Sequence, residues 1–309
     1  RAAAVGKQAH VLDLAGKVVK SLPHPSTVGG LAFDTKGKRL AASHYGGASL
    51  WFVGAKEDKP KVLEWKGSHH LIAFSPDGTH VVTTMQETAL HGWRLADGQH
   101  MRMSGYPTKT RSIAFDAKGK RIAASHYNGA SLWFVNAKED KPRVLDWKGS
   151  HAAIAIHPDG THVVTAMQEM ALHGWRLADG QHMRMSGYPS KTHSLSFTSK
   201  GKWLATSGAE SVVLWPFFGG GPMGKAPTEL AGGDGVICTR VACHPQHEMV
   251  AAGFEDGLVL LTDINTGRVL PVAPPGQGGI SALAWNASGS LLAFGTETGF
   301  VAIVDLTPR

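Results

Sequence analysis

Several short motifs in the chain have residue types and spacing that could support chemistry. The run Gly219–Lys225 matches the start of a phosphate-binding loop, GxxxxGK. Such a loop needs a strand before it, a helix after it and a Ser or Thr hydroxyl that binds magnesium. Ala226 stands at the hydroxyl position, and Pro227 leads into a strand-like run instead of a helix. We therefore interpret this segment as a long glycine-rich turn.

Candidate soft-metal ligands occur in the run His100-Met101-Arg102-Met103 and in its copy at 182–185. Successive side chains of a strand point to opposite faces, so both Met share one face and His shares the other with Arg. Two Met on one strand face are typical of core packing. Cys243 aligns with apolar strand residues, and the chain has no Cys-x-x-Cys pair. We interpret Cys243 as a small buried hydrophobe and predict no metal site at either place.

Catalytic patterns are also missing from the sequence. No nucleophile elbow of the type G-x-S-x-G is present. Ser, His and Asp are common, but they recur at repeated positions, which a single active site does not require. We predict no catalytic residues and no cofactor, and we expect that the protein is not an enzyme.

The composition narrows the class of partner. Lys and Arg outnumber Asp and Glu by 31 to 24, and the formal net charge is +7. Much of the Lys lies in turn segments such as Lys36-Gly37-Lys38, whereas a nucleic-acid surface needs clustered charge interleaved with aromatic residues. No apolar run approaches the roughly 18 residues of a membrane span. We expect a cytoplasmic monomer with no nucleic-acid and no membrane partner.

Internal repetition determines the predicted fold. Residues 31–107 return at 113–189 with about four positions in five unchanged, and a shorter period of roughly 40 residues runs through most of the chain. Each short unit contains four short runs rich in β-branched and aromatic residues, closed by Gly, Pro, Asn or Asp. Four-stranded sheets of this kind bury both faces when they stack around an axis, which predicts a β-propeller.

The same units resemble WD repeats. Phe74-Ser75-Pro76-Asp77-Gly78 is similar to the turn after the first strand of a WD repeat, Gly67-Ser68-His69 is similar to the Gly-His opening, and Leu214-Trp215 is similar to the Trp-Asp strand. Ser43-His44-Tyr45 and Ala242-Cys243-His244-Pro245 resemble bacterial WD-repeat proteins of unassigned function. One departure is clear, because the residue after Trp is Phe, Arg or Pro in the best-preserved repeats and is not Asp.

We predict an all-β protein, a propeller of four-stranded antiparallel blades with eight blades favoured and seven as the alternative. The chain starts at Arg1 in strand-like sequence, so we expect some N-terminal strand material to be missing. The prediction places residues 1–309 in a single domain. Its blade units are approximately 1–26 (partial), 27–66, 67–107, 108–148, 149–189, 190–232, 233–275 and 276–309 (partial).

The resemblance implies a non-enzymatic scaffold that binds a protein partner through one propeller face. The opening loops and the hairpins between second and third strands form this face in WD-repeat propellers, and an exposed Tyr on such a hairpin suits binding. We predict a partner site at these hairpins, comprising His44, Tyr45, Gln86, Glu87, His126, Tyr127, Gln168 and Glu169.

Two alternatives remain open from the sequence. The first is a propeller that binds a metal ion or small ligand at the channel mouth, where His44 and His126 would alternate with Glu87 and Glu169. Packed sheets lie about 10 Å apart and zinc–ligand bonds measure about 2 Å, so one ion could be shared only if the side chains converged. The second is a recently amplified or engineered propeller without a selected function, because two adjacent double units are nearly identical.

Overall fold

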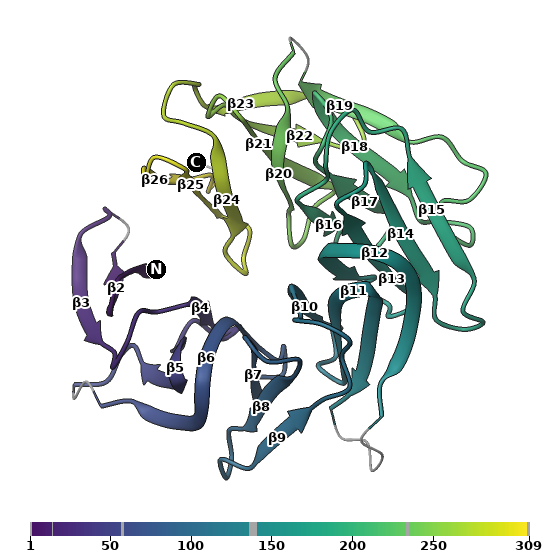
Figure 1. Cartoon of the computed structure of the whole chain (residues 1–309). Coiled ribbons are helices and arrows are strands. Elements are labelled where there is room, and N and C mark those ends of the chain that lie inside the picture. The colour runs from purple at the N-terminus through teal and green to yellow at the C-terminus, as the bar shows by residue number, and fades with distance from the viewer. Residues whose placement is uncertain (1, 14, 57–58, 136–140, 233–234, 308–309) are drawn as a thin grey trace. The chain divides into compact units, whose positions relative to one another are not determined.

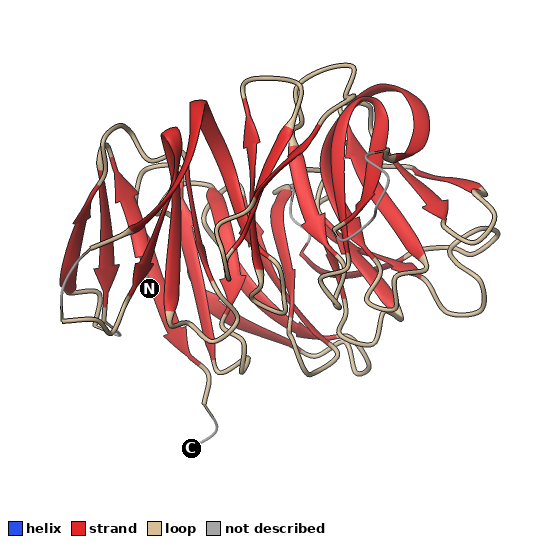
Figure 2. Cartoon of the chain, turned by 90° about the horizontal axis from the view of Figure 1, so that it is seen from below, coloured by secondary structure: helices blue, strands red, loops and turns tan. Residues whose placement is uncertain are grey.

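The computed structural model describes residues 2–13, 15–56, 59–135, 141–232 and 235–307. In these ranges the regular secondary structure consists of 26 β-strands, drawn in red in Figure 2. The all-β prediction is therefore confirmed. The chain forms two compact units, Arg1–Lys148 and Gly149–Arg309, which are described in turn. The prediction of a single domain over residues 1–309 stays a prediction.

The first unit contains strands β1 to β11 and the start of β12 (Figure 1). A three-stranded sheet comprises β1 (Ala2–Val5), β2 (Gln8–Leu12) and β3 (Val18–Pro23). A six-stranded sheet follows, with β4 (Gly30–Phe33), β5 (Arg39–Phe52), β6 (Lys61–Phe74), β7 (His80–Met85), β8 (Leu90–Arg94) and β9 (His100–Met103). The next sheet begins with β10 (Ser112–Phe115), β11 (Arg121–Phe134) and β12 (Arg143–Ile156).

The second unit contains the end of β12 and all later strands. The sheet that β12 enters continues with β13 (His162–Met167), β14 (Ala171–Arg176) and β15 (His182–Ser186). Two four-stranded sheets follow, comprising β16 (Leu195–Phe197), β17 (Trp203–Thr206), β18 (Ser211–Pro216) and β19 (Thr228–Gly232), then β20 (Cys238–Cys243), β21 (Met249–Phe254), β22 (Val259–Asp263) and β23 (Val269–Ala273). The last sheet has three strands, β24 (Ile280–Trp285), β25 (Leu291–Thr296) and β26 (Val301–Asp305).

The predicted number of blades is wrong. The strands form six sheets of three to six strands, not eight blades or seven blades of four strands each. Two predicted units merge because β6 and β12, each 14 residues long, supply the last strand of one unit and the first strand of the next. We expected the run Gly67-Ser68-His69 to separate two blades, but pairing continues on both sides of it.

Strand β5 is a second reason why the observed sheets differ from the predicted four-stranded blades. Fourteen extended residues would span about 45 Å, yet the Val53 N–H donates to the Lys38 carbonyl at 3.0 Å across the ends of β5. The strand therefore reverses direction, and the reversal lies at Tyr45-Gly46-Gly47, where its pairing with β6 shifts register. A Cβ on Gly47 would lie 2.0 Å from the Leu63 carbonyl oxygen, and the φ of Gly47 is +132°, so only glycine fits here.

The core lies where sheets pack face to face. In the first unit Trp51 packs against Leu22 and Leu40, and Trp93 belongs to a separate cluster with Leu50 and Leu63. The second unit repeats this pattern with Trp215 in a cluster that contains Leu172 and Leu204. Because side chains alternate along each strand, neighbouring residues enter opposite layers: Val81 joins the cluster of Trp93, and Val82 joins that of Trp133.

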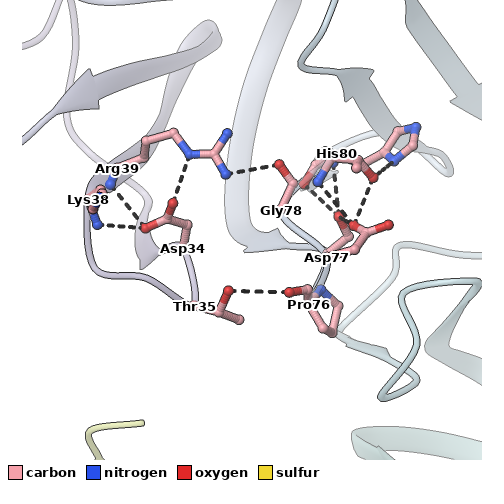
Figure 3. A network of polar contacts seen from close by, with 10 residues as sticks. Asp34, Thr35, Lys38, Arg39, Pro76, Asp77, Gly78 and His80 are labelled. Carbon is pink, nitrogen blue, oxygen red and sulfur yellow. Dashed lines mark hydrogen bonds and ion pairs between the residues drawn. The ribbon is translucent and has the colours of Figure 1, made fainter.

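Turns that follow the first strands link neighbouring repeats by polar contacts (Figure 3). Asp34 is buried, and its carboxylate accepts hydrogen bonds from the Lys38 and Arg39 N–H groups and from Arg39 Nε, the last at 2.8 Å. Arg39 also donates to the Gly78 carbonyl oxygen at 2.9 Å, in the turn of the next repeat. In the second unit His157 donates to the Gly201 carbonyl oxygen at 2.8 Å in the same way.

Candidate functional site

The first unit exposes one Tyr on each of two equivalent hairpins. Tyr45 is 55% exposed and Tyr127 is 44% exposed. Their backbones are fixed, since the Tyr45 N–H donates to Ser26 Oγ at 2.7 Å and the Tyr127 N–H donates to Thr108 Oγ1 at 3.0 Å. Each Tyr therefore presents a large ring to solvent from a hairpin tip that is held in place.

The histidines beside these tyrosines are buried and are not available to a partner. His44 is 2% exposed and His126 is 1% exposed. His44 Nδ1 donates to the Tyr45 carbonyl at 2.9 Å, so Nε2 accepts from Ser49 Oγ at 2.8 Å. His126 makes the same two bonds. Both histidines brace the hairpin tips, and burial lowers the pKa of His126.

Gln86 and Glu87 are exposed beside Tyr45. Tyr45 pairs with Ser68 across the sheet, and the Ser68 carbonyl accepts the Gln86 N–H at 3.2 Å. Tyr45 and Gln86 therefore flank the same residue. We call Tyr45, Gln86, Glu87 and Tyr127 the hairpin face of the first unit.

The second unit carries the other two predicted site residues. Gln168 and Glu169 are exposed, and the Gln168 N–H donates to the Ser150 carbonyl at 3.1 Å. Met170 is 52% exposed next to them, and the sequence prediction missed it. The first copy has Thr88 at this position, so the difference between the two copies was the signal that could have identified Met170.

Trp65, at 36% exposed, also lies outside the predicted site. Its indole stacks on the imidazole of His100, with ring centroids 4.1 Å apart and planes at 11°. His100 Nε2 and His91 Nδ1 lie 2.9 Å apart in a hydrogen bond. His91 is fully buried, and burial together with the neighbouring His100 lowers its pKa to about 3. These histidines are neutral near pH 7 and serve packing.

The second unit repeats the paired histidines. His173 Nδ1 and His182 Nε2 lie 2.8 Å apart. Burial lowers the pKa of His173 to about 4, with the charge on His182 as the next cause. The described residues contain no group of three or more His, Cys, Asp or Glu side chains arranged to hold a metal ion.

Two buried Trp residues, Trp51 and Trp215, each donate to a partner 27 positions earlier in the chain. Trp215 Nε1 donates to the Tyr188 hydroxyl at 2.6 Å, and that hydroxyl donates to Thr206 Oγ1 at 2.7 Å. In the first unit Trp51 Nε1 donates to His24 Nε2 at 3.1 Å. These contacts join a loop that precedes a repeat to the third strand of that repeat.

Two other sequence motifs, Cys243 and the segment Gly219–Lys225, make local contacts in the structure. Cys243 has a hydrogen bond from Sγ to the Ser196 carbonyl at 3.2 Å, and burial raises its pKa to about 12, so it is not a reactive thiolate. In the segment Gly219–Lys225, Lys225 Nζ donates to the Phe218 carbonyl and lies over the Phe218 ring. No strand or helix begins there within the described residues. The described residues also hold no helix of the length and apolarity needed to cross a membrane.

Comparisons with known proteins agree with the repeated sheets. The family model of the anaphase-promoting complex subunit 4 WD40 domain matches residues 241–308. THO complex subunit 3 of Arabidopsis thaliana is 21% identical over 77% of this chain and 76% of its own length. Autophagy-related protein 16 of the same plant is 22% identical over 74% of this chain and 46% of its own length. WD repeat-containing protein slp1 of Schizosaccharomyces pombe is 25% identical over 57% of this chain and 38% of its own length.

Among solved structures, the crystal structure of the computationally designed Ika8 protein is similar, with a TM-score of 0.79 over 98% of this chain and 92% of that chain. The sequence identity is 18%, so this likeness concerns the fold alone. Together with the WD40 match and the WD-repeat relatives, it supports a WD-repeat β-propeller.

Proposed function

We propose that the chain is a scaffold that binds a protein partner through the hairpin face of its first unit. The observation that carries the proposal is the exposure of Tyr45 and Tyr127 at 55% and 44% on hairpins whose backbones are fixed. Tyr contributes a large contact area with few rotatable bonds and is enriched at binding hot spots. Because the backbone of each hairpin tip is already ordered, less conformational entropy is lost when a partner binds.

The polar neighbours of the two rings support the same proposal. Gln86 and Glu87 are exposed beside Tyr45 and provide hydrogen-bond groups around an aromatic anchor. Gln168, Glu169 and the exposed Met170 would provide a comparable surface in the second unit. His44 and His126 hold the tips and contact no partner in this proposal.

The names of the relatives support scaffolding in general. THO complex subunit 3 is by its name part of a complex, and the matching family model is named for a subunit of the anaphase-promoting complex. We propose by analogy that this chain assembles with other proteins. The proposal includes a cytoplasmic monomer that has no catalytic activity and takes neither nucleic acid nor a membrane as its partner.

A photo-crosslinking experiment tests the face. A benzophenone amino acid replaces Tyr45 or Tyr127, and in control proteins it replaces Phe52 or Phe134. Phe52 and Phe134 are aromatic residues of the same repeats with 55% and 53% exposure, so they match in size and accessibility. The proposal expects one protein crosslinked from both Tyr positions and from neither Phe position. Equal labelling from all four positions would contradict it.

One alternative keeps a specific observation in its favour. The near-identity of residues 31–107 and 113–189 fits a propeller amplified recently or by engineering, without a selected partner. Under that alternative the two Tyr positions capture no protein above the Phe controls. The metal- or ligand-binding alternative has weaker support, since His44 and His126 are buried and bonded to Ser49 and Ser131.

A further inference from the structure

The second unit contains a small cavity that the hairpin face does not include. Its volume is about 200 Å³, and the loop at 186–189 and the hairpin and outer strand of the following repeat line it. Drug-sized ligands occupy pockets of roughly 300 Å³ or more. The cavity is therefore suited to a single amino-acid side chain or a molecule of that size.

Aromatic rings and carboxylates meet at this cavity. Tyr188 and Trp215 line its inner part and are 6% and 7% exposed. Their polar atoms are already used, because Trp215 Nε1 donates to Tyr188 and Tyr188 donates to Thr206. What remains for a ligand is the small part of each ring that lines the cavity, and aromatic rings attract cations through their quadrupole.

Two carboxylates add charge of the matching sign. Glu210 and Glu229 both line the cavity and are exposed. The Ser211 hydroxyl donates to Glu229 Oε2 at 2.6 Å and fixes that side chain. Among the described residues that line the cavity, none is Lys, Arg or His. The cavity is thus locally acidic in a chain whose formal net charge is +7.

The internal repeats show that the carboxylates are specific to this copy. Trp51 and Trp133 are the counterparts of Trp215. All three lie at the same repeat position, directly after a Leu that follows Ser or Val. The counterparts of Glu210 are Gly46 and Asn128. Glu229 pairs with Val213, which lies two residues before Trp215. In the first copy the residue two before the Trp is Ser49, and it pairs with Val62, so Val62 is the counterpart of Glu229. Val144 takes the place of Val62 in the second copy.

We propose that this cavity binds a cation, an alkylguanidinium or alkylammonium group of the size of an Arg or Lys side chain. The rings of Tyr188 and Trp215 receive the cation and its alkyl stem, and Glu210 and Glu229 balance its charge. The site does not depend on the hairpin face, because it lies in the second unit and uses none of the same residues.

Nuclear magnetic resonance of the full chain tests the proposal with propylguanidinium as the probe. The indole N–H signals of Trp215, Trp133 and Trp51 are followed during titration. We expect the Trp215 signal to shift, with no shift of the other two, and no shift with propylurea, the neutral analogue. Equal shifts of all three signals, or equal effects of both compounds, would overturn the proposal.

Charge-neutral variants provide the second measurement. Glu210→Gln and Glu229→Gln should each weaken propylguanidinium binding about threefold, the size expected for an exposed ion pair, and the double variant about tenfold. Gln keeps the carbonyl oxygen that accepts from Ser211, so the fold should persist. Glu297→Gln, a change at an exposed carboxylate outside the cavity, should leave affinity unchanged. Unchanged binding by the double variant would also overturn the proposal.

Two sources of the cation are then distinguished with an acetylated Gly-Arg-Gly amide and its citrulline analogue. Tighter binding of the Arg peptide than of propylguanidinium assigns the cavity to a side chain of a protein. Equal affinity assigns it to free cations. Failure of both cationic probes to bind rules the site out.

Discussion

His91 Nδ1 and His100 Nε2 lie 2.9 Å apart, in a pair whose first member is buried and whose second is partly buried, and the ring of Trp65 packs against both. The neutral pair holds one proton between these two nitrogens, and protonating both rings would place two positive charges in contact. The pair recurs as His173 and His182 in the second unit. The repeat has thus placed the same titratable arrangement in both units.

As pH falls, the protein should begin to lose stability at pH values well above those at which carboxylates titrate. The folded-state pKa values of His91 and His173 are lowered from 6.5 to about 3 and about 4. The unfolded chain therefore binds more protons below pH 6.5, and stability that is complete above this pH is lost as pH falls towards these values. Each proton taken up on unfolding contributes about 1.4 kcal/mol per pH unit.

Urea unfolding at pH 7.5, 6.0 and 5.0 measures this effect. We expect the free energy of unfolding to fall steadily over the series. A free energy of unfolding that is constant from pH 7.5 to 5.0 would contradict the account of the histidine pairs.

Gly47→Ala and Gly129→Ala should each destabilise the first unit by about 2–4 kcal/mol, since the new Cβ combines strain with a clash. The ideal Cβ positions lie 2.0 and 2.1 Å from the Leu63 and Leu145 carbonyl oxygens. Gly98→Ala is the control, because its φ of +80° is also positive but its Cβ meets nothing within 4 Å. Chemical denaturation should show a loss of only about 1 kcal/mol for this control.

Tyr188→Phe should cost about 1–3 kcal/mol, because it leaves the buried Trp215 N–H without its acceptor. Tyr127→Phe removes the same atom from an exposed ring and should change the free energy of unfolding by less than about 0.5 kcal/mol. Thermal and urea unfolding of the two variants compare them directly. Equal losses would show that the Trp–Tyr bond does not stabilise the repeat.

Arg39→Ala should lower stability by about 2–4 kcal/mol, because it leaves the buried carboxylate of Asp34 without its cation. It also removes the bond from Arg39 to Gly78 in the next repeat. The Arg94–Asp97 pair, which is exposed, provides the matched comparison, and Arg94→Ala should have a much smaller effect. Denaturation midpoints that are lowered equally would contradict the role assigned to the Asp34 turn.

Sequence periodicity was sufficient for the all-β class and for many individual strands. The two units predicted to be partial, 1–26 and 276–309, contain the three-stranded sheets β1 to β3 and β24 to β26. The blade number failed because glycines that look like breaks, such as Gly47 and Gly67, bend the chain while hydrogen bonding continues past them.

The candidate site was predictable only in part. His44 and Tyr45 are adjacent, so alternation alone indicates that one is buried and the other exposed, but not which one. In the structure His44 is the buried residue, because its Nε2 accepts a hydrogen bond from Ser49 Oγ. The two residues can meet only because β5 reverses direction between them. The cavity in the second unit could not be predicted, because Tyr188, Glu210 and Glu229 approach one another only after folding.

We propose that Tyr45 and Tyr127 form part of the surface that binds a protein partner. The most direct test is the affinity of the crosslinked partner, measured by calorimetric titration with the unmodified chain, the Tyr45→Ala/Tyr127→Ala variant and the Phe52→Ala/Phe134→Ala variant. We expect the Tyr double variant to bind at least tenfold more weakly, a loss of about 1.4 kcal/mol or more, and the Phe double variant to bind with unchanged affinity. Equal affinity of all three proteins would contradict it.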